Sequence, residues 1–169
     1  MTNKFNIELA DISSHDAVRI LGLLSDRLQQ ITGDSGVSSF SAQAMTEVGA
    51  CFVIARDKQG NALGCGALRR LKSGIAELKQ MYAQPGYPGL GTSILSSLES
   101  HARQLGYQQI WLETRRINKR AVSFYLARGY HEIDNYGQYK GRAEAVCFAK
   151  TLDLKDNENR DKDKTQTRI

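Results

Sequence analysis

Apolar and polar positions follow clear periods along the first half of the chain. Residues 5–10 alternate between the two kinds, which predicts a strand. Apolar side chains then recur every three or four positions, which predicts a helix over about residues 15–30, and a weaker pattern over 40–48 predicts a second, shorter helix. Two turn-forming stretches, Lys-Gln-Gly-Asn and Lys-Ser-Gly, separate the three β-prone runs that follow. These runs predict an antiparallel meander over residues 51–56, 63–71 and 75–83.

The pattern changes after residue 83. Residues 84–91 contain both prolines and three glycines, and the apolar residues after them repeat at helical spacing as far as Gly106. A short apolar run at 110–112 predicts a buried strand. A strand, a glycine loop, a helix and a strand in this order form a βαβ unit. The two strands should therefore be parallel and joined by a right-handed crossover.

The remaining segments complete the predicted fold. A helix is expected over 118–128, and closing strands over 130–133 and 145–152. We predict one domain of the α/β (α+β) class over residues 1–152. Its central sheet should have about seven mostly antiparallel strands with one parallel βαβ unit, flanked by about four helices. Residues 153–169 have almost no apolar side chains and are predicted to be a disordered tail.

Composition and charge exclude several classes of protein but do not identify the function. The 169 residues are 41% hydrophobic and 24% charged, without a bilayer-length apolar run, which is typical of soluble globular proteins. No signal peptide is seen, and three widely spaced cysteines argue against a disulfide framework or a metal site. A cytoplasmic location is expected. The net charge of +5 suits a polyanionic ligand but is too mild to indicate nucleic acid.

A glycine-rich loop at residues 88–93 directly precedes a predicted helix. The first amides of a helix lack partners and carry a partial positive charge, and glycines let the backbone close on an anion. The loop is therefore a candidate pyrophosphate cradle. It is not a Walker loop, because no Gly-Lys-Ser/Thr follows, and the antiparallel strands before it argue against a Rossmann fingerprint. An ordinary turn before a helix is the alternative for the loop taken alone.

Several motifs in a fixed order resemble the GNAT N-acetyltransferase superfamily. Residues 77–83 read Glu-Leu-Lys-Gln-Met-Tyr-Ala, where family members commonly read Glu-Leu-Lys-Arg-Met-Tyr-Val. The glycine loop and an amphipathic helix follow, then Trp-Leu-Glu-Thr at 111–114. Residues 118–130 then read Asn-x-x-Ala-x-x-x-Tyr-x-x-x-Gly-Tyr. The close similarity covers residues 75–130, and the looser order of elements covers 5–152.

The loop departs from the family pattern, which is usually Arg/Gln-x-x-Gly-x-Gly/Ala. Here residues 86–91 read Gly-Tyr-Pro-Gly-Leu-Gly, so the basic or amide residue is missing. Because of this departure, an alternative function is also considered. The protein would keep the same fold but act as a non-catalytic CoA-binding or regulatory module.

The resemblance implies acetyl-CoA as the cosubstrate, no metal, and roles for individual residues. Tyr125 would be the general acid, because a phenol with a pKa of about 10 stays protonated at neutral pH and can meet a leaving thiolate. Glu77 would be the general base, directly or through a water, with Glu113 a weaker candidate. A backbone amide near Met81 or Tyr82 would face the thioester oxygen. The implied coenzyme-binding residues are Met81, Tyr82, Ala83, Gly89, Leu90, Gly91, Thr92, Ser93 and Asn118.

Each assigned side chain also has a purely structural explanation. Met81 could be a core residue, Tyr125 could simply pack on Phe124, and Asn118 could cap its helix. Tyr139, expected to line the acceptor pocket, could be part of a packed aromatic turn, and Glu77 could be an ordinary strand residue.

The predicted function is transfer of an acetyl group from acetyl-CoA to a primary amine of a small molecule or peptide. The amine would attack directly in a ternary complex, without a covalent enzyme intermediate. No nucleic acid or membrane partner is expected. A homodimer is compatible with the sequence, although no motif supports one, and no motif identifies the acceptor.

Overall fold

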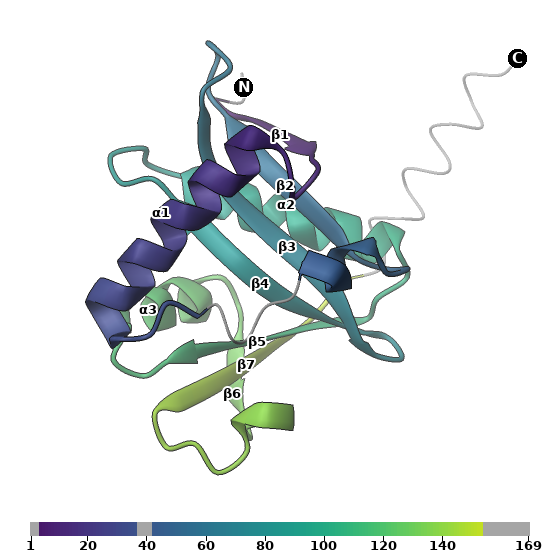
Figure 1. Cartoon of the computed structure of the whole chain (residues 1–169). Helices are drawn as coiled ribbons and strands as arrows, with labels where there is room; N and C mark the ends of the chain where they lie inside the picture. The colour runs from purple at the N-terminus through teal and green to yellow at the C-terminus, as the bar shows by residue number, and fades with distance from the viewer. Residues whose placement is uncertain (1–3, 37–41, 154–169) are drawn as a thin grey trace, which may run out of the picture.

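The computed structural model of the chain describes residues 4–36 and 42–153, and its centre is a seven-stranded sheet in the order β1-β2-β3-β4-β5-β7-β6 (Figure 1). Only β4 and β5 pair in parallel; all other neighbours are antiparallel. The predicted meander and the βαβ unit are both confirmed. The strands are β1 (Asn6–Leu9), β2 (Cys51–Arg56), β3 (Ala62–Lys72), β4 (Ile75–Ala83), β5 (Gln109–Arg115), β6 (His131–Ile133) and β7 (Ala145–Thr151).

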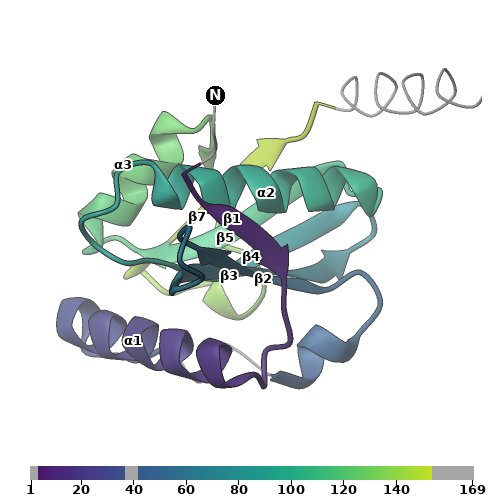
Figure 2. The ribbon, with the colours of Figure 1, turned by 90° about the horizontal axis from the view of Figure 1, so that it is seen from above.

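Helices cover both faces of this sheet, as the view from above shows (Figure 2). Helix α1 (His15–Thr32) lies on one face, where Ile20 and Leu24 pack against β2, β3 and β4. Helices α2 (Leu90–Gln104) and α3 (Lys119–Ala127) lie on the other face. The apolar stripe of α2 includes Ile94 and Leu98, both fully buried in the larger core cluster. The 3.6-residue period therefore identified most of the buried face of α2, whereas Val18, predicted on the apolar face of α1, and Leu105, predicted on that of α2, are exposed.

About four helices were predicted, and two of the observed helices are short 3₁₀ helices. Within the described residues there are three α-helices and two 3₁₀ helices, at Ala42–Thr46 and Gly137–Tyr139. The described part of the shorter helix expected over 40–48 is thus a 3₁₀ helix, while residues 40 and 41 lie outside the described residues. Its Met45 packs against the core cluster under α1, but none of its residues is fully buried, so little apolar contact stabilises a longer helix.

The parallel strands β4 and β5 diverge after three residue pairs. Pairing ends at Glu77 and Trp111, although β4 continues to Ala83 and β5 to Arg115. The cause lies in β4: Gln80 has φ +58°, and the register against β3 shifts by one residue between Cys65 and Ala67. Such a bulge bends a strand and increases its twist. Beyond Glu77, one edge of β4 therefore has no strand beside it.

The described chain ends just past β7. Leu152 is buried and donates its amide to the carbonyl of Gln108, and the Asp153 carbonyl accepts from Arg103. The rest of the predicted tail, residues 154–169, lies outside the described residues. No helix within the described part of the chain is long and apolar enough to cross a bilayer.

Candidate active site

Two cavities meet at the point where β4 and β5 diverge. One, of about 470 Å³, extends from the end of β4 along the glycine loop between α1 and α3. The other, of about 390 Å³, lies beyond the divergence, against β5 and the loop that follows β6. We name them the loop cavity and the far cavity. Six residues line both: Leu24, Leu28, Met81, Asn118, Ala121 and Tyr125.

Two glycines shape the loop cavity. Gly89 is the N-cap of α2 and has φ +82°, a conformation that L side chains rarely adopt. A Cβ on Gly91 would lie 3.3 Å from the ring of Phe124, so this glycine lets α2 approach α3 closely. Both needs are met by glycine alone, which explains the Gly-Leu-Gly sequence physically. The backbone at the start of α2 is left open to the cavity.

The loop does not offer every donor that the sequence suggested. The amide of Leu90 donates to the Tyr87 carbonyl, and the amide of Ser93 donates to the Gly89 carbonyl. The Leu90 side chain is buried in the core, and Ser93 lines neither cavity. The first-turn amides of Gly91 and Thr92 remain as the donors that suit an anion.

Three arginines line the loop cavity: Arg27, Arg120 and Arg128. Arg128 lies over the ring of Phe124, with its Cζ 4.3 Å from the ring centre, and donates to the Thr92 hydroxyl at 2.7 and 3.0 Å. A cation is therefore held beside the first turn of α2, although the loop itself has none. Arg27 donates to the Ala83 carbonyl at 3.3 Å.

The end of β4 lies in the wall between the cavities. Met81 lines both, while Tyr82 and Ala83 line only the loop cavity. Their side chains have structural roles: Tyr82 packs beneath α1, and Met81 and Ala83 pack against the larger core. The backbone of this segment can also meet a ligand, along the strand edge that β5 leaves unpaired.

Tyr125 lies where the two cavities meet. It is 7% exposed, and its hydroxyl has no hydrogen-bond partner among the described residues. Burial raises the pKa of this phenol well above its ordinary value, so the group is protonated at neutral pH. Asn118 lines both cavities as well and caps α3, with its Oδ1 accepting from the Ala121 amide at 3.3 Å.

Glu77 lies away from both cavities. Its carboxylate is 1% exposed, accepts from Arg69 Nε at 2.7 Å and from the Tyr136 hydroxyl at 2.5 Å, and lies 3.9 Å from Lys79 Nζ. It lines neither cavity wall. Of the structural alternative, a strand residue facing solvent or Lys79, only the part concerning Lys79 agrees with the structure, because the carboxylate is buried and paired.

Glu113 is the carboxylate that the structure brings to the far cavity. It lies on β5, two residues past the last pair with β4. Desolvation raises the pKa of this carboxyl, and the nearby charges of Lys79 and Arg115 oppose the rise only in part. A carboxylate with a raised pKa accepts a proton more readily near neutral pH.

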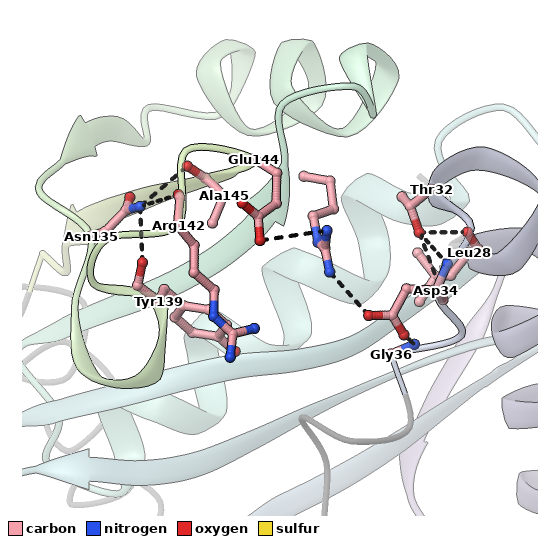
Figure 3. Close-up of polar contacts among 10 residues, drawn as sticks. Leu28, Thr32, Asp34, Gly36, Asn135, Tyr139, Arg142, Glu144 and Ala145 are labelled. Carbon is pink, nitrogen blue, oxygen red and sulfur yellow. Dashed lines mark hydrogen bonds and ion pairs between the residues drawn. The ribbon is translucent and has the colours of Figure 1, made fainter.

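The outer wall of the far cavity is a loop fixed to β4 and β7. The Asn135 amide donates to the carbonyls of Tyr139, Arg142 and Ala145 at 3.0–3.3 Å (Figure 3). The Tyr139 hydroxyl accepts from Lys79 Nζ at 2.8 Å. Tyr139 therefore lines the far cavity and is also a packed aromatic, buried against Tyr136.

The opposite wall comes from the end of α1. The Thr32 hydroxyl donates to the Leu28 carbonyl at 2.8 Å, and the Asp34 amide donates to the Thr32 hydroxyl at 3.1 Å (Figure 3). The Asp34 carboxylate then pairs with Arg115 of β5 at 3.0 Å. This ion pair fastens the end of α1 over the divergent strands.

Several wall residues could not have been found from the sequence. Asp34 and Arg142 lie in loops without a motif, and they face the cavity only because α1 and β7 lie beside β5. The proximity of Lys79 to Glu77, in contrast, could have been predicted from the sequence. It follows Glu77 by two positions on a strand, which puts both side chains on one face of the sheet.

The cysteines lie outside both cavities. Burial raises the pKa of Cys65 to about 12 and that of Cys51 to about 11, and it also raises the pKa of Cys147. Thiols with such pKa values are poor nucleophiles at neutral pH.

Comparisons with known proteins agree with this arrangement. An IAA acetyltransferase of Azospirillum brasilense is 31% identical over 91 residues, which are 52% of this chain and 59% of that protein. An uncharacterized N-acetyltransferase of Schizosaccharomyces pombe is 31% identical over 88 residues, 50% of this chain and 54% of its own. The chain thus spans about half the length of the curated relatives it matches.

Solved structures share the fold over nearly the whole chain. A Klebsiella pneumoniae protein, provisionally assigned as an acyl-CoA N-acyltransferase, superimposes with a TM-score of 0.74 at 25% identity, over 88% of this chain and 98% of its own. A GNAT acetyltransferase from Elizabethkingia anophelis, solved with acetyl-CoA bound, superimposes with a TM-score of 0.66 at 14% identity. The superposition covers 89% of this chain and 100% of that protein. At that identity, the second likeness shows the fold alone.

The match to a family model covers the loop cavity and part of the far cavity. The model of the acetyltransferase (GNAT) family matches residues 19–130, well over half of the chain, and this range includes the glycine loop, Glu113 and Tyr125. The chain therefore belongs to the GNAT acetyltransferase family.

Proposed function

We propose that the protein transfers the acetyl group of acetyl-CoA to a primary amine of a small molecule or peptide. The observation that carries the proposal is the meeting of two cavities at Met81 and Tyr125, where β4 has an unpaired edge. A long thioester in the loop cavity and an amine in the far cavity would reach each other at that point.

The loop cavity fits coenzyme A. Gly89 and Gly91 leave the α2 amides approachable, and Arg128 adds a cation beside them. These are the groups that a diphosphate needs. The free edge of β4 from Leu78 to Ala83 offers backbone groups to the amides of the pantetheine arm. The bound coenzyme would supply the acetyl group as a thioester, and an amide near Met81 would donate to its carbonyl oxygen.

In the proposed transfer, one bond forms, one bond breaks and two protons move. The amine nitrogen forms a bond to the thioester carbonyl carbon, and the carbon–sulfur bond breaks. The amine loses a proton to Glu113, directly or through a water, and the leaving sulfur receives a proton from the Tyr125 hydroxyl. The buried, protonated cysteines outside the cavities support direct transfer rather than an acyl-enzyme.

Glu113 replaces Glu77 in this proposal. Glu77 is enclosed by Arg69 and Tyr136, and an amine in either cavity would not touch it. Glu113 faces the cavity, has a raised pKa and lies on the strand that forms one side of the divergence. Tyr125 lies in the wall between Glu113 and the loop cavity.

Incubation of the full chain with acetyl-CoA and a panel of amines, with release of free thiol as the readout, tests the proposal. We expect thiol release that depends on one class of amine, together with an acetylated product seen by mass spectrometry. Calorimetric binding of acetyl-CoA without turnover of any amine would favour a CoA-binding regulatory module. Absence of acetyl-CoA binding would reject both readings.

A further inference from the structure

The far cavity contains two opposite charges that the fold leaves without a direct partner. Arg142 and Glu113 both line it. Among residues 4–36 and 42–153, no hydrogen bond or ion pair within 4 Å reaches the guanidinium of Arg142 or the carboxylate of Glu113. Figure 3 shows the Arg142 side chain running toward the ring of Tyr139, with no contact drawn from its guanidinium.

The other charges of this cavity are already neutralised. Arg115 pairs with Asp34 at 3.0 Å and lies 3.9 Å from Glu144, so two carboxylates surround one guanidinium. Lys79 donates to the Tyr139 hydroxyl and lies 3.9 Å from Glu77. A ligand would have to break these pairs to use them. Arg142 and Glu113 are the charges that a ligand can meet without breaking a pair.

The two groups are near enough to serve one small molecule, because both line the same cavity. The positive charge of Arg142 is also among those that act on the Glu113 carboxyl. A cavity of about 390 Å³ suits a ligand the size of an amino acid. An unpaired carboxylate in a partly buried site is costly, and a ligand ammonium beside it would offset that cost.

We propose that the acceptor is a small aminocarboxylate, such as a free amino acid, whose amine is received by Glu113 and whose carboxylate is bound by Arg142. This inference rests on the proposed function, since it assigns the far cavity to the acceptor. Arg142 would form charge-assisted bonds to the carboxylate, with the forked geometry that a guanidinium offers. Arg142 then selects the acceptor and takes no part in the chemical step.

The test compares amino acids with their C-terminal amides, which keep the amine and lack the carboxylate. Binding of each pair to the full chain saturated with coenzyme A is measured by calorimetry, so that turnover is not needed. We expect one or more amino acids to bind about 10- to 100-fold more tightly than their amides, the range for one charged hydrogen-bonding contact. Arg142→Gln should remove that difference by weakening only the carboxylate forms.

A matched control is Arg116→Gln. Arg116 is an exposed arginine that pairs with Glu132 at 3.0 Å and lines neither cavity, so this change should leave both ligand forms unaffected. Amides that bind as well as the acids, equal weakening of both by Arg142→Gln, or no binding of any amino acid would overturn the inference. Arg142-dependent binding of carboxylates without acetyl transfer would support it while rejecting the proposed reaction.

Discussion

The Tyr136 hydroxyl donates a hydrogen bond to the buried carboxylate of Glu77 at 2.5 Å. This contact ties the loop after β6 to the centre of β4. The same carboxylate accepts from Arg69 of β3, and Lys79 reaches the neighbouring Tyr139 hydroxyl. Glu77 thus holds the outer wall of the far cavity in place. It can therefore affect acceptor binding without touching the acceptor.

Replacement of Glu77 by Gln should therefore act on structure and acceptor binding. The free energy of unfolding should fall by about 1–3 kcal/mol, less than for a fully buried ion pair because the Arg69 side chain is 35% exposed. The KM for the amine should rise, because the wall that Tyr136 and Tyr139 form loosens. Denaturant unfolding and steady-state kinetics measure the two effects.

Tyr136→Phe is the matched variant for this network, since it removes one hydrogen bond to Glu77 and keeps the ring. It should raise the same KM with a smaller loss of stability. If Glu77→Gln instead removed the acid limb of the pH–rate profile at unchanged KM, Glu77 would be the base and the assignment of Glu113 would be wrong.

Replacement of Tyr125 by Phe should reduce kcat by about 10²- to 10⁴-fold, the usual contribution of a positioned proton donor. The fold should be unaffected, because the hydroxyl has no partner among the described residues and the ring keeps its packing. Acetyl-CoA affinity, measured by calorimetry, should change little. A fall in kcat of less than about threefold would show that another group protonates the leaving sulfur.

The pH dependence of catalysis should reflect the protonation of the Glu113 carboxylate. Its pKa is raised in the folded state, so the base is ionised only above that raised value, and kcat should fall as pH decreases through it. Glu113→Gln should remove this limb together with most of the activity.

Although Glu113→Gln should reduce activity, it should not reduce the stability of the fold. A carboxyl whose folded pKa lies above its unfolded value binds its proton more tightly when folded, so the wild type loses stability as pH rises between the two values. Glu113→Gln should remove that loss, and its Tm at neutral pH should equal or exceed that of the wild type. A clear drop in Tm would mean that the carboxylate has a stabilising partner.

Replacement of Arg128 by Gln should weaken acetyl-CoA binding about 10-fold, because the cation that is hydrogen-bonded to Thr92 in the first turn of α2 would be lost. Binding to the wild type should weaken more steeply with added salt than binding to the variant. Calorimetric titrations at two ionic strengths test this. The Arg116→Gln variant again serves as the control, and equal affinities for all three proteins would exclude a role for Arg128 in anion binding.

The periodic parts of the fold were predictable. The β-prone run at 75–83 and the apolar stripe after Gly91 place β4 and α2 correctly, because turn residues bound the strand and the helix must bury one face. A shorter helix was expected over 40–48, and its described part forms a 3₁₀ helix at 42–46, with Met45 packed against the core cluster under α1. Local pattern alone cannot show whether so short a segment will form an α-helix or a 3₁₀ helix.

The site was predictable where a motif fixes the backbone. Gly89, Gly91, Asn118 and Tyr125 lie at the predicted cavities, because a glycine turn and a helix cap are local features. The roles proposed for them in binding and catalysis remain predictions. Ser93 was placed among them by proximity in sequence, but the first turn of α2 directs it away from the loop cavity.

The sequence by itself determined the order of strands and helices, the glycine loop and the apolar faces that make the core, because these depend on neighbours within a few residues. Only the tertiary structure decided which carboxylate faces the far cavity. Glu77 lies at the last β4–β5 pair and is enclosed by Arg69 and Tyr136, whereas Glu113 lies beyond that pair and faces the cavity. That outcome depends on contacts between β3, β4, β5 and the loop before β7, which come together only when the chain folds.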